Sequence, residues 1–348
     1  MQIDNSQPVL VTGANGYLAS WIVKELLDAG CTVHATVRDP SNSKKVAHLQ
    51  ALAEQAPGTL KLFAADLLRD GSFEEAMQGC GVVLHTASPF VIRGIRDPQK
   101  ELIDPAVQGT RNVLQSCNRV DSVQRVVLTS SVVSIYGDNA DAKGRELTES
   151  DWNNTSSAKH QPYPASKVAA ERAAWEVCKA QSRWDLVVIN PGLVLGPSLT
   201  QASGSESLAI IGDLVKGKLR MGVPDLEMGL VDVRDVAQAH LRAAFLKDAK
   251  GRHILVSDSI TMMGIADVIR AKHPGRFRLP TTLAPKLLVW LVGPLQGVSR
   301  KFVRLNVGHP LRFDNRKSRE ALGLEYRPVA DTILEHLDQM LSDGLVRG

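Results

Sequence analysis

Cysteine is scarce in this chain, and no two cysteines stand in a CxxC arrangement of the kind that binds metals or exchanges disulfides. The four cysteines are Cys31, Cys80, Cys117 and Cys178. Each lies in or beside an apolar segment, where a free buried thiol is the simplest interpretation. Free thiols suit a reducing compartment, so we expect a cytoplasmic protein.

Long apolar runs are also missing. The first residues, MQIDNSQP, are polar and lack the apolar core of a signal peptide. The most apolar later stretch, residues 283–298, is short for a spanning helix and contains Lys286 and Pro294. We expect no membrane span and predict a buried helix there, with contact to a membrane surface as the alternative.

Charge of one sign is not gathered into a run. The net charge is +4 and the basic residues are scattered, which disfavours a nucleic-acid partner. Asp, Glu and His show no metal-ligand spacing, so no metal is predicted. With 44% hydrophobic and 22% charged residues, the composition is that of a soluble globular protein with a large core.

Strand-like and helix-like segments alternate through the first half of the chain, without internal repeats. The predicted strands are residues 8–12, 32–37, 60–65, 82–86, 125–129 and 186–190. The predicted helices are residues 17–29, 44–55, 72–77, 103–118 and 165–181. Strands separated by helices predict an α/β fold with a doubly wound parallel sheet, the Rossmann arrangement.

The alternation breaks after Pro191, where Gly and Pro become frequent. One more strand–helix unit is predicted at 230–246 and another strand at 253–256. We assign residues 1–190, continued by 228–257, to the Rossmann domain. Residues 191–227 and 258–348 then form mainly a smaller C-terminal lobe, which could cover a site at the strand ends and bind a substrate.

A glycine-spaced turn joins the first predicted strand to the first predicted helix. Gly13, Gly16 and Ala19 form GxxGxxA within VTGANGYLASW. Small residues let the backbone approach a pyrophosphate, and the helix N-terminus offers N–H groups and a positive dipole end. A tight turn without a ligand is the alternative, but the position after the first strand favours a dinucleotide site.

The end of the second predicted strand indicates which dinucleotide binds. A carboxylate there would bind a ribose 2′-hydroxyl, whereas this strand ends in VRDPSNSKK, with Arg38 in that place. Cations suit a 2′-phosphate, so NADP(H) is predicted over NAD(H). Asp39 supports the opposite choice, and solvated surface charges are the alternative for the cations.

Later strand ends add residues to the same edge of the sheet. Asp66 and Leu67 follow the third strand, where an adenine would lie, although Asp66 could also cap a helix. Thr86, Ala87 and Ser88 follow the fourth strand, where small side chains leave room for a ribose.

A pair of residues in YPASK predicts acid–base chemistry. Tyr163 and Lys167 are four residues apart and share a helix face. An ammonium group beside a phenol lowers the pKa of the phenol, so this tyrosine could exchange a proton with a substrate oxygen. Such a pair also occurs by chance. Ser130 and Ser131 end the fifth strand, where a hydroxyl can hydrogen-bond a carbonyl oxygen.

Together the motifs resemble the extended short-chain dehydrogenase/reductases, and most closely the group of dihydroflavonol, cinnamoyl-CoA and yeast-type carbonyl reductases. The matching segments cover roughly the first 245 residues in order. They are VTGANGYLAS, TVRDP, DLLRDGSFEEAMQGCGVVLHTASPF, VQGTRNVL, RVVLTSSVVSIYG, YPASKVAAE, INPGLVLGP and LVDVRDVAQAH.

The resemblance implies a catalytic triad of Ser131, Tyr163 and Lys167. Many other extended members place the serine one residue later, where this chain has Val132, and this favours the reductases over epimerases and dehydratases. The resemblance also implies a set of NADP(H) contacts. They are Thr12, Gly13, Asn15, Gly16, Tyr17, Leu18, Arg38, Lys45, Asp66, Leu67, Thr86, Ala87, Ser88, Thr129, Tyr163, Lys167, Pro191, Gly192 and Leu193.

The substrate contacts expected are Phe90, Ser131, Tyr136 and Tyr163. Aromatic and aliphatic side chains at 90–92 and 136 indicate an apolar or aromatic substrate. Flavonoid reductases usually carry Asn or Asp where this chain has Tyr136, which disfavours a flavonoid.

The sequence therefore predicts NADPH-dependent reduction of an aldehyde or ketone to an alcohol, with Tyr163 as general acid. The alternatives are an NAD-retaining epimerase or dehydratase, a 3β-hydroxysteroid-type dehydrogenase, and a non-catalytic NADP(H) sensor. A monomer or homodimer is usual in the group that the chain resembles.

Overall fold

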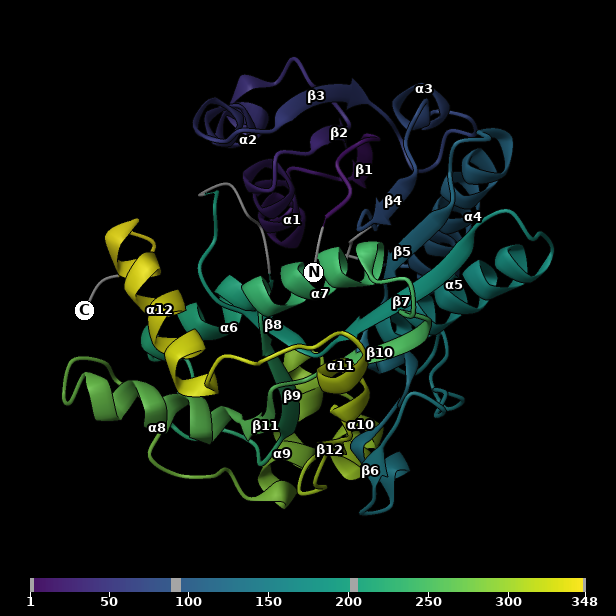
Figure 1. Ribbon diagram of the computed structural model, residues 1–348. Coiled ribbons are helices and arrows are strands. Elements are labelled where there is room, and N and C mark those ends of the chain that lie inside the picture. The colour runs from purple at the N-terminus through teal and green to yellow at the C-terminus, as the bar shows by residue number, and fades with distance from the viewer. Residues whose placement is uncertain (1–2, 89–94, 201–205, 347–348) are drawn as a thin grey trace.

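The computed structural model describes residues 3–88, 95–200 and 206–346 (Figure 1). Its centre is a seven-stranded sheet whose neighbouring strands all pair in parallel. From edge to edge the strands are β10 (Gly251–Leu255), β7 (Asp185–Pro191), β5 (Arg125–Thr129), β4 (Val82–His85), β1 (Val9–Thr12), β2 (Thr32–Val37) and β3 (Thr59–Ala64). The strand order reverses between β1 and β4, the point where doubly wound sheets bind ligands.

Helices cover both faces of this sheet, as the alternating pattern predicts (Figure 1). One face carries α1 (Tyr17–Asp28), α2 (Ser43–Gln55) and α7 (Val233–Phe245). The other carries α3 (Glu74–Met77), α4 (Asp104–Arg119) and α5 (Pro162–Lys179). In β1, Val9 and Val11 join the first core and Leu10 joins the second, because successive strand side chains point to opposite faces.

A three-stranded sheet forms a second, smaller core. It consists of β11 (Asp258–Thr261), β9 (Glu227–Asp232) and β8 (Leu193–Leu195), packed with α6 (Glu206–Val215), α8 (Met262–Lys272) and α12 (Val329–Ser342). The strand and helix predicted together at 230–246 therefore belong to different layers. β9 lies in the small sheet, whereas α7 packs on the large one. Asp232 links them, since its carboxylate caps α7 through the N–H of Arg234 at 2.8 Å.

Short elements complete the chain. They are the π-helix η1 (Gln99–Ile103), the 3₁₀ helices η2 (Val132–Ser134), η3 (Asn139–Ala142) and η4 (Gly293–Gln296), the helices α9 (Lys286–Val292), α10 (Arg300–Asn306) and α11 (Arg316–Ala321), and the paired strands β6 (Glu146–Leu147) and β12 (Arg312–Phe313).

The apolar segment 283–298 is exposed, so the prediction of a buried helix is wrong. Helix α9 has no buried residue, and Leu287 and Leu295 are 69% and 86% exposed. The reason is that α6, α8 and α12 already close the small core, to which α9 contributes no side chain. Within the described residues, no helix is long and apolar enough to cross a membrane.

Candidate active site

The glycine-spaced turn brings the start of α1 against the end of β4. Gly13 has φ +65°, a left-handed conformation that glycine adopts without strain. A Cβ atom there would lie 3.0 Å from the Cβ of Ala87. The N–H of Gly16 donates to the carbonyl of Gly13 at 2.9 Å, which closes the turn one residue before α1. The first N–H groups of α1 therefore open toward the ends of β1 and β4.

A cleft of about 450 Å³ lies at these strand ends. Nine of the predicted cofactor residues line it, namely Gly13, Asn15, Gly16, Arg38, Asp66, Leu67, Thr86, Ala87 and Ser88. Sequence reasoning missed Thr36, Val37, Ala65, Leu68 and Phe73, which line it too. Most of these could have been found by the same rule, because Thr36 and Val37 end β2 and Ala65 follows β3.

Three predicted cofactor residues lie beside this cleft without lining it. Thr12 is fully buried, and its hydroxyl accepts the N–H of Thr86 at 3.1 Å, so it fixes the end of β4. The Tyr17 hydroxyl donates to the carbonyl of Gly196 at 2.6 Å, across to the small lobe. Leu18 packs against the core of the large sheet.

The charges at the end of β2 favour a phosphate over a ribose hydroxyl. Arg38 lines the cleft, is exposed, and makes no ion pair with any residue in the described ranges. Asp39 instead accepts the backbone N–H and hydroxyl of Ser41, at 2.9 and 2.5 Å. The bond from the Ser41 hydroxyl holds the pKa of Asp39 below its usual value. Lys45 is exposed in the first turn of α2. The residues present therefore fit a 2′-phosphate.

The two serines after β5 have different surroundings. Ser130 is buried, and its hydroxyl donates to Glu171 Oε2 at 2.5 Å. Ser131 is half-buried and precedes η2, and its Oγ lies 3.4 Å from both the backbone nitrogen of Val133 and the carbonyl oxygen of Pro191. Because η2 packs against α5, Ser131 stands beside the helix that carries Tyr163.

Tyr163 and Lys167 lie at the start of α5, which begins at Pro162 rather than at the predicted Ala165. Proline is tolerated at the first helical position because no N–H is needed there. The Nζ atom of Lys167 is 5.9 Å from the centre of the Tyr163 ring and 3.5 Å from Ser88 Oγ. Burial lowers the pKa of Lys167 to about 8, and the nearby Glu171 acts in the opposite direction.

A buried ion pair lies behind these residues. Glu171, one turn beyond Lys167, accepts from Arg252 Nε at 2.6 Å and from Asn190 Nδ2 at 2.9 Å. Asn190 also donates to the carbonyl of Ser131 at 3.1 Å. The sequence analysis did not predict this network. The spacing could have indicated Glu171, because a residue four positions after Lys167 lies on the same helix face. The ion pair therefore holds the backbone that carries the serines.

The residues predicted to hold the nicotinamide end lie where the chain passes between the two sheets. Pro191 ends β7 and Leu193 starts β8. Gly192 donates to the carbonyl of Leu255 at 3.0 Å, and a Cβ atom on it would overlap the carbonyl of Gly229. The Thr129 hydroxyl contacts a buried histidine, His240, at 2.7 Å.

Tyr163 lines a second cavity, which has a volume of about 480 Å³. Its lining includes Tyr136 as predicted, together with Ile95, Leu102, Val133, Leu226, Met228 and Phe302. The Tyr136 ring meets Phe313 edge-on at 5.7 Å, and burial raises the pKa of its phenol. Phe90, also predicted to contact substrate, lies outside the described residues.

Gln161 and Asn306, two polar side chains that line this cavity, bond the same carboxylate. Asp138 is buried and accepts from His160 at 2.7 Å, Gln161 at 2.8 Å and Asn306 at 2.7 Å. Gln161 has φ +58°, an unfavourable conformation for a residue with a side chain, and stands immediately before α5. The Asp138 network thus joins the start of α5 to α10 of the C-terminal lobe.

His85 is not a free acid–base group. It is buried, its Nδ1 contacts the Thr12 hydroxyl at 2.9 Å, and burial lowers its pKa to about 3. Across the described ranges, no three His, Cys, Asp or Glu side chains are grouped to hold a metal ion.

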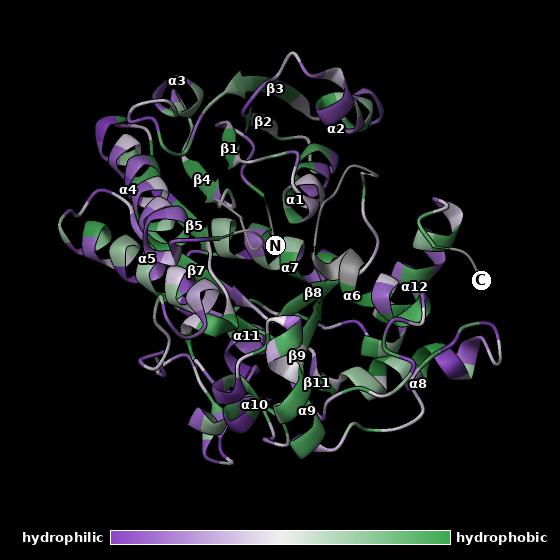
Figure 2. Cartoon of the chain, turned by 180° about the vertical axis from the view of Figure 1, so that it is seen from behind, coloured by the Kyte–Doolittle hydropathy of each residue, from purple (hydrophilic) through white to green (hydrophobic). Residues whose placement is uncertain are grey.

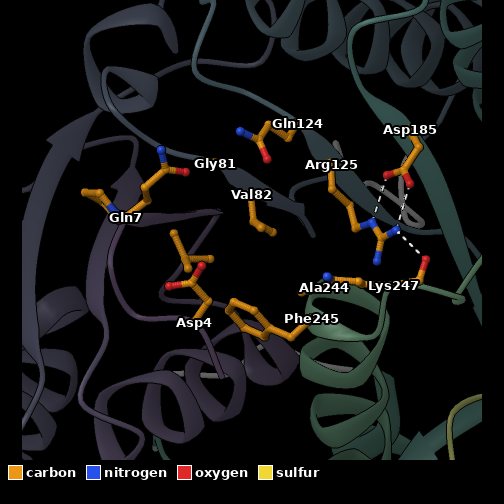
Figure 3. A pocket seen from close by; sticks show the side chains of 12 residues that line it. Asp4, Gln7, Gly81, Val82, Gln124, Arg125, Asp185, Ala244, Phe245 and Lys247 are labelled. Carbon is orange, nitrogen blue, oxygen red and sulfur yellow. Dashed lines mark hydrogen bonds and ion pairs between the residues drawn. The ribbon is translucent and has the colours of Figure 1, made fainter. Parts of the chain in front are cut away.

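A further cavity, of about 370 Å³, lies at the opposite, amino ends of the strands (Figure 3). Arg125 forms its charged wall, with Nε 2.8 Å from Asp185 Oδ1 and one amino group 2.6 Å from the carbonyl of Leu246. The Arg125 side chain therefore links β5 to β7 through Asp185 and to the end of α7 through Leu246. Doubly wound sheets bind ligands at the other edge, so we assign this cavity a structural role.

Comparison with known proteins agrees with the geometry. The model of the NAD dependent epimerase/dehydratase family matches residues 9–257. A cinnamoyl-CoA reductase from Medicago truncatula is 37% identical over 335 residues, which is 95% of each chain. An anthocyanidin reductase from Arabidopsis thaliana is 38% identical over 77% of this chain and 81% of its own.

Solved structures are similar over almost the whole chain. The crystal structure of Gre2 in complex with NADPH from Candida albicans has a TM-score of 0.80 and 32% identity, and the match covers 97% of this chain and 99% of that one. Family model, relatives and fold agree with the motifs. The chain belongs to the NAD dependent epimerase/dehydratase family, that is, the extended short-chain dehydrogenase/reductases, in the group of cinnamoyl-CoA, dihydroflavonol and yeast-type carbonyl reductases.

Proposed function

We propose that this chain is an NADPH-dependent reductase that converts an apolar or aromatic aldehyde or ketone to an alcohol. Its relatives are named reductases, and a similar structure contains NADPH. One observation carries the proposal most directly. Lys167 reaches Ser88 in the cofactor cleft, while Tyr163, on the same helix face, lines the apolar cavity. The first turns of α5 therefore join the two cavities.

The cofactor cleft offers a matching group for each charged part of NADPH. The Gly13–Gly16 turn and the first N–H groups of α1 would hold the pyrophosphate. Arg38 and Lys45 would hold the 2′-phosphate, since both are exposed cations at the end of β2 and the start of α2. When bound, the cofactor supplies the hydride that reduces the carbonyl carbon.

The protein supplies the proton and the polarisation. Tyr163 donates its hydroxyl proton to the carbonyl oxygen as that oxygen gains negative charge. Ser131 donates a hydrogen bond to the same oxygen and orients it. The ammonium group of Lys167 favours the tyrosinate that remains, because opposite charges attract strongly where water is excluded.

The lining of the cavity beside Tyr163, called the substrate cavity below, supports an apolar class of substrate. Asn306 and Gln161 donate to Asp138, and the Asn139 amide donates to the carbonyls of Glu227 and His309. A charged or strongly hydrogen-bonding substrate would have to break these bonds. Aliphatic and aromatic walls therefore favour a neutral, apolar carbonyl compound.

The proposal is tested by following NADPH consumption with a panel of aldehydes and ketones, with NADH in parallel. In the variant Tyr163→Phe we expect kcat to fall by about 10²- to 10⁴-fold, with NADPH affinity unchanged. Tyr326→Phe is the matched control, because that hydroxyl bonds Ser318, away from both cavities. An enzyme inactive on every carbonyl that releases NAD⁺ when denatured would be an epimerase or dehydratase instead.

A further inference from the structure

One part of the C-terminal lobe carries a cluster of exposed apolar side chains. We call it the α9 surface. It comprises Leu283, Leu287, Leu288, Leu291, Val292 and Leu295, which are 41% to 86% exposed. Figure 2 shows α9 as a hydrophobic helix at the edge of the molecule, away from the large sheet. A cluster of exposed leucines on a soluble fold indicates an interaction site.

The apolar side chains follow the spacing of one helix face. Leu287, Leu288 and Leu291 lie at positions i, i+1 and i+4, and Leu295 continues the row in η4. None of them lines the substrate cavity or joins the small core. The α9 surface therefore lies outside both the lining of the substrate cavity and the small core.

The segment of the chain that includes this surface is rich in cations. Residues 268–313 contain nine Arg and Lys and no Asp or Glu, although the whole chain carries only +4. Helix α10 packs against α9, and the Arg300 guanidinium lies 4.4 Å from the centre of the Trp290 ring. Lys301 and Arg304 are exposed on the same helix. Leucines, a tryptophan and a rim of cations thus lie together.

We propose that the α9 surface docks on an anionic lipid membrane, with α9 lying in the plane of the headgroups. Leucine side chains would enter the boundary between headgroups and acyl chains, and the cations of α10 would contact lipid phosphates. Tryptophan prefers the same depth. A second copy of the chain fits less well, because a two-fold contact would place like charges opposite one another.

Flotation of the full-length protein with lipid vesicles tests the proposal. We expect binding to vesicles of mixed phosphatidylcholine and phosphatidylserine, little binding to phosphatidylcholine alone, and weaker binding at high salt. The double variant Leu287→Glu/Leu291→Glu should lose the binding. Leu345→Glu, at an exposed leucine near the other end of the lobe, should retain it.

Single charge changes give a second, graded measurement. Lys301→Gln should weaken vesicle binding about fivefold, the effect of one cation near a charged membrane surface. Lys61→Gln, on the far edge strand β3, should leave it unchanged. NADPH consumption by each variant with a water-soluble aldehyde or ketone, compared with wild type, keeps the outcome separate from the proposed function.

Two results would overturn the proposal. Equal binding of wild type and the Leu287→Glu/Leu291→Glu variant would show that another surface contacts lipid. A self-associated wild-type protein that ignores vesicles, and that the same variant converts to monomer, would make the α9 surface a contact between copies of this chain.

Discussion

Lys167 lies one helical turn after Tyr163 and 3.5 Å from the Ser88 hydroxyl, and its charge depends on the groups that surround it. Burial removes water from the ammonium group and lowers its pKa to about 8, while Glu171 favours the charged form. The same ammonium group is needed in the proposed chemistry to stabilise the tyrosinate. The buried Glu171–Arg252 pair behind it is therefore part of the proposed site's electrostatics.

Lys167 should make the stability of the cofactor-free protein depend on pH. Its folded-state pKa of about 8 is below the ordinary value of 10.5, so the unfolded state binds more protons between these pH values. The free energy of unfolding should then rise with pH across this window, by about 1.4 kcal/mol per pH unit at most. Urea unfolding of wild type and Lys167→Met measures the difference. A constant difference from pH 8 to 10.5 would contradict the assignment.

The adjacent serines should respond differently to the same substitution. Ser131→Ala should lower kcat/KM by about 10²- to 10³-fold with little change in stability, because a donor to the substrate oxygen is lost. Ser130→Ala should destabilise the fold by about 1–3 kcal/mol, since it removes a buried hydrogen bond to Glu171. Kinetics and urea unfolding of both variants separate the two effects. A large loss of kcat/KM in Ser130→Ala and a large loss of stability in Ser131→Ala would contradict this assignment of the two serines.

At the scale of elements, the β2–α2 turn carries the charged side chains on which the predicted choice of dinucleotide rests. The Asp39 side chain turns back onto Ser41 and leaves Arg38 facing the cleft. The side chains of Arg38 and Asp39 thus point in different directions, because the Asp39 carboxylate accepts the backbone N–H of Ser41, two residues ahead in the turn. The sequence predicted NADP(H), with Asp39 as the opposing signal, and the backbone geometry of the turn also favours the cation.

Arg38→Gln should raise the KM for NADPH about tenfold or more and leave the KM for NADH nearly unchanged. A charge-assisted hydrogen bond contributes about 1.5–3 kcal/mol, and only NADPH carries the 2′-phosphate. Steady-state kinetics with both cofactors measures the ratio. Lys179→Gln, an exposed cation at the end of α5, is the control. Equal losses with both cofactors would exclude a 2′-phosphate contact.

At the scale of the whole molecule, polar contacts connect the large sheet to the C-terminal lobe. Tyr17 and Trp21 of α1 donate to the carbonyls of Gly196 and Pro197, at 2.6 and 2.8 Å. The buried carboxylate of Asp138 connects the start of α5 to Asn306 of α10. The proposed substrate cavity, lined by residues from both parts, therefore depends on contacts that are distant in the sequence.

Asp138→Ala should destabilise the protein by about 3 kcal/mol or more and raise the KM for the carbonyl substrate. The change leaves buried donors of His160, Gln161 and Asn306 without their acceptor. Asp138→Asn keeps one acceptor oxygen and should lose less. Asp121→Ala, at a side chain that is 97% exposed, is the control for urea unfolding. Similar losses at positions 121 and 138 would count against the network.

The sequence by itself determined the class of the fold and most of the residues that line the cleft at the strand ends. Alternating apolar and periodic segments predict the parallel sheet, because each pattern has a repeat that only one element satisfies. The bounds of β2 and β5 match the structure at both ends. The positions of Gly13, Arg38 and Ser88 along one cleft were predictable too, since each follows a strand and parallel strands bring their carboxyl ends to one edge of the sheet.

Only the tertiary structure decided the rest. It separated Ser131 from Ser130, placed β9 in the small sheet, and joined Asp138 to Asn306. It also left α9 on the surface, where its apolar sequence predicted burial. Each of these depends on which distant segment fills the neighbouring space. A local pattern records how apolar a segment is, but not whether the core beside it is already full.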